Sequence, residues 1–157
     1  MSIKNIKPTN ENYKQGYIDV SESTKYIGPL PVIFRSSWER KFAFYCENND
    51  KIIKWSSEPF AIKYYNTLDK KFRTYYPDFY IKIDRGDYFE ECVVEVKPKA
   101  QLKKPLPPKK KTKKAIEAYR KAAVTYLKNL CKKDALLKFA KDRKYKVMYI
   151  TEDHWII

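Results

Sequence analysis

Strand-like patterning is strongest in the middle of the chain, where two runs rich in β-branched and aromatic residues flank a short polar turn. The runs read Tyr-Pro-Asp-Phe-Tyr-Ile-Lys-Ile and Tyr-Phe-Glu-Glu-Cys-Val-Val-Glu-Val-Lys, and the turn between them is Asp84–Asp87. Such runs on either side of a turn predict a β-hairpin over residues 76–97. Gly86 supplies the positive φ that tight turns often require.

The register of this hairpin decides which side chains share a face of the sheet. A loop of two or four residues centred on the turn places Asp78 opposite Val93. Because successive side chains point to opposite faces, Glu95 and Lys97 are then expected on the face of Asp78. Asp78 and Glu95 become diagonal neighbours, with Cα atoms roughly 7–8 Å apart. The two valines that alternate with Glu95 and Lys97 point the other way, into a core.

Apolar residues at helical spacing predict helices before and after the hairpin. The first is an amphipathic helix that starts at Ser36 and ends near Asn48, with its apolar face formed by Trp38, Phe42, Tyr45 and Cys46. Two further helices are expected over residues 114–131 and 135–143. Lys132 and Lys133 interrupt the pattern between them, and Asp134 is a suitable N-cap for the last one.

Shorter apolar runs complete the expected sheet. Antiparallel strands over residues 52–55, 60–65 and 72–76 form a meander that feeds the hairpin, and residues 145–151 form a closing strand at the sheet edge. The two C-terminal helices are expected to cover the apolar face of the sheet. Four tyrosines on these strands either pack on the sheet, which is the commoner role, or stack on nucleic-acid bases: Tyr64, Tyr65, Tyr75 and Tyr76.

Composition divides the chain into an arm, a domain and a basic loop. Residues 1–30 are polar and turn-rich and predict an irregular N-terminal arm, and residues 31–157 predict one domain. Within the domain, residues 98–114 hold four prolines and predict an extended, solvent-facing loop. Its lysines form either a solvated face or a grip on phosphates next to the hairpin: Lys99, Lys103, Lys104, Lys109, Lys110, Lys111, Lys113 and Lys114.

The overall charge favours a polyanionic partner. The chain has 34 basic and 19 acidic residues in 157, a net charge of +15, which points to nucleic acid before membrane. No apolar run approaches a membrane span, and the first residues lack the apolar core of a secretory signal. The three cysteines are widely spaced and predict reduced thiols, and the single His154 is expected to be structural. No Gly-rich phosphate loop is present, which argues against use of a nucleotide triphosphate.

Asp78, Glu95 and Lys97 allow two interpretations. Charged side chains on an otherwise apolar strand cost free energy unless they are paired or bind a metal. In the first interpretation the hairpin is a surface element whose charges form salt bridges. In the second, a divalent cation relieves the repulsion between the two carboxylates and keeps positions open for water and phosphate oxygens.

Glu39 also allows two interpretations. It follows Ser36 by three residues, as in a capping box that satisfies backbone donors at a helix start. Alternatively, it is a third acidic ligand that the first helix delivers to the hairpin. The pattern alone favours the capping box, and one glutamate can serve both roles through different oxygens.

These residues resemble the Pro-Asp…(Asp/Glu)-x-Lys nuclease superfamily. Pro77-Asp78 and Glu95-Val96-Lys97 match its motif, and Arg35-Ser36-Ser37-Trp38-Glu39 is similar to the Arg-Ser-x-x-Glu helix of transposon end-cleaving and phage head completion nucleases. The resemblance is greatest to the head completion nucleases of contractile-tailed phages and runs from about Arg35 to Thr151. It implies an α/β, restriction-endonuclease-like core, in which helices flank a mixed central sheet with the antiparallel hairpin.

The resemblance also implies a chemistry. Asp78, Glu95 and the Val96 carbonyl would hold Mg²⁺, with Mn²⁺ as a substitute and Glu39 as a further ligand, and Lys97 would complete the catalytic set. The reaction would be hydrolysis of DNA left at the packaged head, before the tail attaches. Head and portal proteins are then the expected partners, and the host cytoplasm and the head–neck of the virion the expected locations.

Three other functions fit the same sequence. A non-catalytic DNA-binding protein of the virion head or neck would keep the nuclease shell without its activity. A transposon- or recombination-type endonuclease would cut specific ends. Charge and motif also allow RNA as the substrate. Retention of both carboxylates and the lysine favours an enzyme over the non-catalytic protein.

Overall fold

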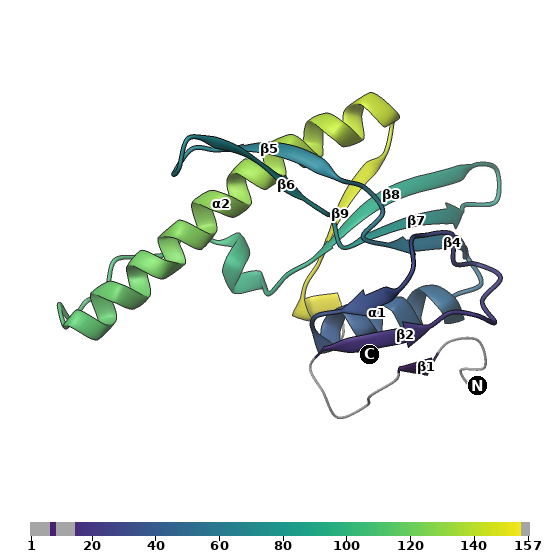
Figure 1. The fold of residues 1–157 in the computed structure, drawn as a ribbon, viewed down its shortest axis with the longest axis horizontal. Helices are drawn as coiled ribbons and strands as arrows, with labels where there is room; N and C mark the ends of the chain where they lie inside the picture. The colour runs from purple at the N-terminus through teal and green to yellow at the C-terminus, as the bar shows by residue number, and fades with distance from the viewer. Residues whose placement is uncertain (1–6, 9–14, 155–157) are drawn as a thin grey trace.

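A four-stranded mixed sheet lies between two helices and carries the predicted hairpin at its centre (Figure 1). The computed structural model describes residues 7–8 and 15–154. The strand order is β4-β7-β8-β9; the first three are mutually antiparallel neighbours, and β9 runs parallel to β8 at the edge. This arrangement confirms the predicted α/β class and the closing edge strand. The strands are β4 (Ile52–Ser57), β7 (Phe79–Asp84), β8 (Phe89–Val96) and β9 (Lys146–Ile150).

The two faces of the sheet have separate apolar cores. Phe79 and Val94 face α1 (Ser37–Asn48), which buries Phe42 and Cys46 against them. Val93 faces the opposite side, where it packs with Leu136 of the second helix, α2 (Lys113–Arg143). Alternation along β8 therefore places Val94 and Glu95 on different faces, as the period of two predicted.

The register of the central hairpin differs from the prediction by two residues. Phe79 pairs with Val94, so Asp78 lies level with Glu95 and not opposite Val93. The loop is Arg85–Tyr88, one residue later than expected, and Gly86 has the positive φ of +90°. Because the displacement is an even number of residues, every side chain keeps its predicted face.

Strands β5 (Ile62–Asn66) and β6 (Lys71–Tyr75) do not join the sheet as a meander, which corrects the predicted topology. They pair only with each other, and β4 pairs directly with β7. Pro59 and Pro77 flank this excursion and lack the N–H that a continuous ladder needs. The result is a separate β5–β6 hairpin that extends beside α2 (Figure 1).

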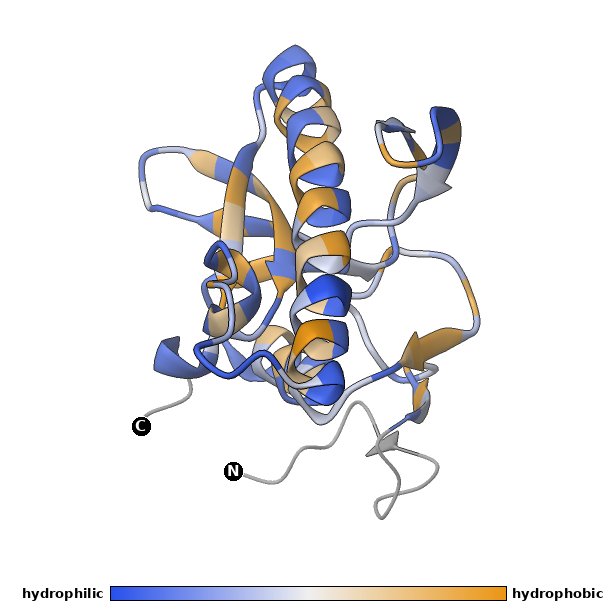
Figure 2. Ribbon diagram, turned by 90° about the vertical axis from the view of Figure 1, so that its left-hand side faces the viewer, coloured by the Kyte–Doolittle hydropathy of each residue, from blue (hydrophilic) through white to orange (hydrophobic). Residues whose placement is uncertain are grey.

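Helix α2 is a single helix of 31 residues, and the predicted break at Lys132–Asp134 is wrong. No Gly or Pro lies in this stretch, so continuing the backbone ladder costs less than ending one helix and nucleating another. Thr112 caps its start, and Lys144 ends it in the left-handed conformation. Apolar residues occur along the whole helix (Figure 2), but only Leu136 and Ala140 are fully buried. The N-terminal half projects past the sheet and does not cover it as predicted (Figure 1).

Part of the N-terminal arm is regular, contrary to the expectation of an irregular segment. β2 (Gly16–Asp19) lies between β1 (Lys7–Pro8) and β3 (Val32–Phe34) in a small antiparallel sheet. Ile18 of β2 is buried in the same core as α1. Residues 1–6 and 9–14 of the predicted arm, and 155–157 at the other terminus, lie outside the described residues.

Candidate active site

The adjoining ends of β7 and β8 bring Asp78, Glu95 and Lys97 together. Asp78 immediately precedes β7, and its Oδ2 accepts a hydrogen bond of 2.7 Å from the Val96 backbone N–H. The Lys97 ammonium lies 3.0 Å from Glu95 Oε2. Glu95 is only 4% exposed, so this is a buried carboxylate beside a second carboxylate and one cation.

Burial and mutual repulsion dominate the electrostatics of the carboxylates. Burial, followed by the charge of Glu95, raises the pKa of Asp78 to about 8, although the Val96 N–H and Lys97 oppose the shift. Burial alone would lower the pKa of Lys97, but the charges of Glu95, Asp78 and Glu39 outweigh it and raise the pKa. Lys97 is therefore an ammonium at neutral pH, and its charge does not prevent the rise in the pKa of Asp78.

The donor set fits a divalent cation. Glu95 Oε1 is buried and has no hydrogen-bond partner among the described residues, which leaves an acceptor unsatisfied beside a second carboxylate. Oxygen ligands of this kind are those that Mg²⁺ prefers. Within residues 7–8 and 15–154, no three His, Cys, Asp or Glu side chains form a ready-made metal cluster. The fit therefore rests on Asp78 and Glu95, with other positions open to water and phosphate.

Ser36 is the N-cap of α1, Glu39 takes part in the capping hydrogen bonds, and the charge of Glu39 also acts on the site. Its Oε2 accepts a hydrogen bond of 2.7 Å from the Arg35 N–H, and its own N–H donates to Ser36 Oγ at 3.1 Å. The Ser36 half of the predicted capping box is thus present, whereas the Glu39 carboxylate accepts from the Arg35 N–H in place of the Ser36 N–H. Its negative charge raises the pKa of Asp78 and of Lys97, which places it within electrostatic reach. A role for Glu39 as a metal ligand stays a proposal.

Three residues, Tyr75, Lys132 and Tyr149, act electrostatically on the carboxylates, a role that was not predicted from the sequence. Burial and the charges of Glu95 and Asp78 raise the pKa of Tyr149 to about 12, and the same causes raise the pKa of Tyr75. The Tyr75 hydroxyl donates to the Lys132 carbonyl at 3.1 Å. Burial and nearby lysines lower the pKa of Lys132, against the attraction of the two carboxylates. No sequence signal identifies them, because β6, β9 and α2 meet only in the tertiary structure.

The predicted DNA-binding lysines fall into three groups. Lys99 lies in a 3₁₀ helix (Lys99–Leu102) and pairs with Asp153 at 2.6 Å, so it is anchored to the C-terminal segment. Lys113 and Lys114 belong to the first turn of α2, which corrects the predicted loop boundary. The remaining five are exposed on the segment between the 3₁₀ helix and α2: Lys103, Lys104, Lys109, Lys110 and Lys111.

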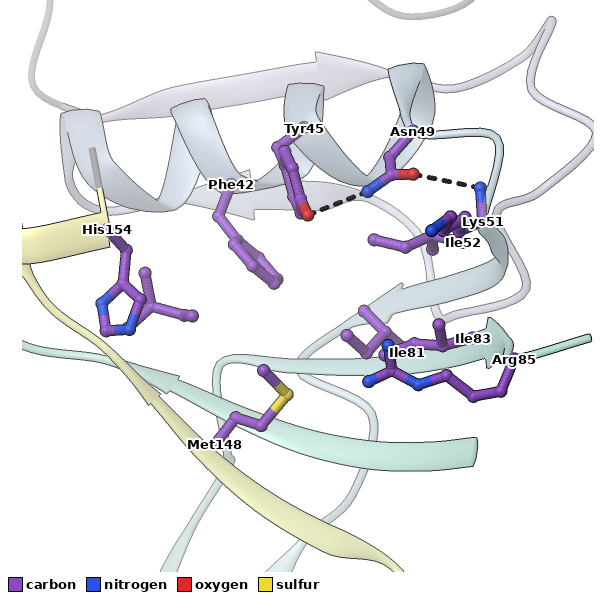
Figure 3. A pocket seen from close by; sticks show the side chains of 11 residues that line it. Phe42, Tyr45, Asn49, Lys51, Ile52, Ile81, Ile83, Arg85, Met148 and His154 are labelled. Atoms are coloured by element: carbon purple, nitrogen blue, oxygen red, sulfur yellow. Dashed lines mark hydrogen bonds between the residues drawn. The ribbon is translucent and has the colours of Figure 1, made fainter. Parts of the chain in front are cut away.

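A mostly apolar cavity lies on the other face of the sheet and is not the carboxylate site (Figure 3). It has a volume of about 540 Å³ and no acidic residue in its wall, which is formed by Phe42, Tyr45, Asn49, Lys51, Ile52, Ile81, Ile83, Arg85, Met148, Ile150 and His154. His154 Nδ1 accepts a hydrogen bond from the Thr151 N–H at 3.0 Å, a structural role as predicted. A smaller cavity of about 150 Å³ borders Lys97, Gln101 and Tyr149.

The raised pKa of Asp78 predicts a specific pH dependence of stability. A carboxyl with a higher pKa in the folded state stabilises the fold below its unfolded pKa near 4, and this contribution is lost as the pH rises toward 8. The free energy of unfolding, measured by urea denaturation in EDTA, should therefore fall between pH 5 and pH 8. This fall should be larger in the wild type than in Asp78→Asn by about 1 kcal/mol or more. Equal pH slopes in the two proteins would refute the assignment of a strained carboxylate here.

Comparison with known proteins adds an independent observation. Residues 49–152 match the family described as TnsA-like endonuclease N terminal. The chain is similar to the head completion nuclease of Enterobacteria phage T4, with 32% identity over 131 residues that cover 83% of this chain and 85% of the relative. No solved structure gives a significant match. The family match spans Asp78, Glu95 and Lys97, whereas Glu39 lies outside it.

Proposed function

Because the chain belongs to the TnsA-like endonuclease N-terminal family, a nuclease family of the Pro-Asp…(Asp/Glu)-x-Lys type, we propose that it is a Mg²⁺-dependent endonuclease that trims DNA during completion of a phage head, before tail attachment. The observation that carries the proposal is the pairing of the buried Glu95, which has one unsatisfied oxygen, with the half-buried Asp78, next to a protonated lysine. A salt-bridged surface hairpin would have no reason to bury an unpaired acceptor.

Each residue has a definable role in phosphodiester hydrolysis. Asp78 and Glu95 would hold the metal, with the Val96 carbonyl and Glu39 as further candidate ligands. Bound there, Mg²⁺ would lower the pKa of a water and neutralise charge on the scissile phosphate. The Lys97 ammonium would orient the attacking oxygen and stabilise charge that develops on the phosphate. Tyr75 and Lys132 would form the wall that limits access of bulk water.

The choice of DNA as substrate rests on charge and its placement. Five exposed lysines lie on the segment that links β8 to α2, and Lys113 and Lys114 lie at the N-terminus of α2. Lysines in the first turn of a helix are unfavourable because the N-terminal end of the helix dipole is also positive. The lysine charges and the helix N-terminus therefore both attract phosphate. Each lysine that neutralises a duplex phosphate would add about 0.9 to the slope of log affinity against log salt. A nucleotide triphosphate has no recognisable cradle in the sequence.

The biological setting is proposed from the relative's name. A head completion nuclease would act in the host cytoplasm during assembly, with head and portal proteins as partners, and would remain at the head–neck of the virion. Among the described residues, no helix is long and apolar enough to cross a membrane. The family match to a TnsA-like domain supports an alternative, an endonuclease that cuts specific transposon ends.

The first test is metal dependence of cleavage. Linear DNA with blunt, overhang and flap ends should be cut in Mg²⁺ or Mn²⁺ and left intact in EDTA, and excess Mg²⁺ should restore activity. Cutting of any overhang fits head completion, while cutting only at particular ends favours the transposon-type enzyme. If no DNA or RNA is cut in either metal while DNA binding persists, the chain is a non-catalytic DNA-binding protein and the proposal is wrong.

A further inference from the structure

The β5–β6 hairpin begins and ends at the candidate active site. Residues 59–77 leave the sheet after β4 and return before β7, and the Glu58 N–H donates to the Asp78 carbonyl at 3.0 Å where the two ends meet. Any surface on this hairpin is therefore held at a fixed position relative to Asp78.

The two faces of the hairpin differ in character. One face is packed, with Ile62, Tyr64 and Tyr75 buried against α2. On the other face, Tyr65 and Phe72 form a cross-strand pair with ring centroids 5.2 Å apart. Tyr65 is 43% exposed and Phe72 is 74% exposed. Two large aromatic rings side by side in solvent indicate a binding surface, since neither contributes to either apolar core.

The charge around this aromatic pair matches a nucleic acid. The hairpin carries four basic residues, Lys63, Lys70, Lys71 and Arg73, against one acidic residue, Asp69. Arg73 Nε donates to Asp69 Oδ2 at 2.7 Å, which leaves the charges of three lysines in excess. Exposed aromatics among cations are typical of single-strand binding, because stacking requires base faces that an intact duplex hides.

We propose that Tyr65 and Phe72 stack on unpaired bases of the substrate, so that the hairpin selects DNA ends that carry a single-stranded segment. The inference rests on the proposed nuclease function, which does not itself assign a role to the exposed face of the hairpin. A single strand running from the scissile phosphate would pass along the hairpin, with its backbone near the lysines and its bases on the two rings.

The length of the hairpin sets the length of strand required. Asp78 follows Phe72 by six positions along the chain, and an extended chain spans at most about 3.3 Å per position. The rings thus lie within about 20 Å of the site, the length of roughly six nucleotides at 3.4 Å each. The gain from the hairpin should therefore level off at or before an overhang of about six nucleotides.

The test compares Tyr65→Ala/Phe72→Ala with Tyr88→Ala. Tyr88 is also well exposed, at 59%, but lies in the β7–β8 loop at the far end of the sheet from Asp78. Loss of one or two stacking contacts should lower cleavage of a six-nucleotide overhang by about tenfold or more. Cleavage of a blunt duplex should change by less than about twofold, and Tyr88→Ala should cut both substrates like the wild type. Phe72→Trp, which keeps an aromatic ring, should retain the preference for the overhang.

A binding measurement separates failure of this inference from failure of the proposed function. With Glu95→Gln to prevent cleavage, 2-aminopurine in the overhang should be quenched by the parent and by the Tyr88→Ala protein, and much less by the double variant. Absence of cleavage by the wild type with quenching intact would refute the nuclease and keep the stacking surface. Equal quenching by all three proteins, or an equal loss of blunt and overhang cleavage, would overturn the inference.

Discussion

Replacement of Glu95 by Gln is expected to lower the rate of DNA cleavage by about a thousandfold or more while the protein stays folded and binds DNA. Glu95 is the more buried of the two carboxylates, and its Oε1 accepts no hydrogen bond from the described residues. The amide keeps the shape of the side chain but removes the charge that holds the cation. It also removes the repulsion that raises the pKa of Asp78, which offsets the loss of the ion pair with Lys97, so the protein should stay folded without metal.

Glu91→Gln is the matched control for this prediction. Glu91 lies on the same strand and the same face as Glu95, four positions earlier in the chain. Its carboxylate accepts a hydrogen bond from the Tyr80 hydroxyl at 2.8 Å. Single-turnover cleavage at saturating Mg²⁺ should be within about twofold of the wild type for Glu91→Gln. Comparable losses in the two variants would mean that β8 tolerates no amide on this face, and the assignment of Glu95 would lose its support.

The face of each residue on the central hairpin was predictable, but its register was not. Alternation has a period of two, so a displacement of two residues leaves Glu95 and Lys97 on the face of Asp78. The exact pairing depends on the loop, where the Arg85 N–H bonds the Tyr88 carbonyl at 2.9 Å. Several neighbouring residues in this loop favour turns, so the local sequence alone does not determine which two residues form the hydrogen bond that closes it.

The errors outside the hairpin come from competition between local and tertiary structure. Asp134 is a good N-cap in isolation, yet a continuous α2 satisfies the same backbone groups without a new nucleus. The two strands of the β5–β6 hairpin have the alternation of sheet members, and only the prolines at its ends hint at an excursion. The tyrosines divide accordingly: Tyr64 and Tyr75 face α2, and Tyr65 and Tyr76 face solvent.

The motif located the charged centre of the site but not its surroundings. Asp78, Glu95 and Lys97 are close in sequence, so strand pairing alone predicts that they meet. Lys132 and Tyr149 reach the carboxylates from α2 and β9, and nothing in their local sequence marks that approach. Helix capping by Glu39 was predictable because its partners lie within four residues.

Replacement of Lys97 by Met is expected to separate metal binding from chemistry. The Lys97 ammonium lies 3.0 Å from Glu95 Oε2, where it competes with a cation for the same oxygen. Its removal should tighten Mg²⁺ binding, measured by calorimetry, because repulsion between the ammonium and the cation is lost. The single-turnover cleavage rate should nevertheless fall by about a hundredfold or more, because a preorganised charge near the scissile phosphate is lost.

Lys132→Met tests whether loss of any cation near the carboxylates lowers the cleavage rate as much as loss of Lys97. Lys132 is half-buried, and its ammonium lies 5.4 Å from the centroid of the Tyr75 ring, but its charge acts on the carboxylates only at a distance. Its loss should lower the cleavage rate by less than about tenfold and shift Mg²⁺ affinity in the same direction as Lys97→Met. If both variants tighten Mg²⁺ binding and only Lys97→Met loses the chemistry, Lys97 acts on the reacting phosphate. If neither loses activity, Lys97 is only a counter-ion to Glu95, and the catalytic set reduces to the two carboxylates.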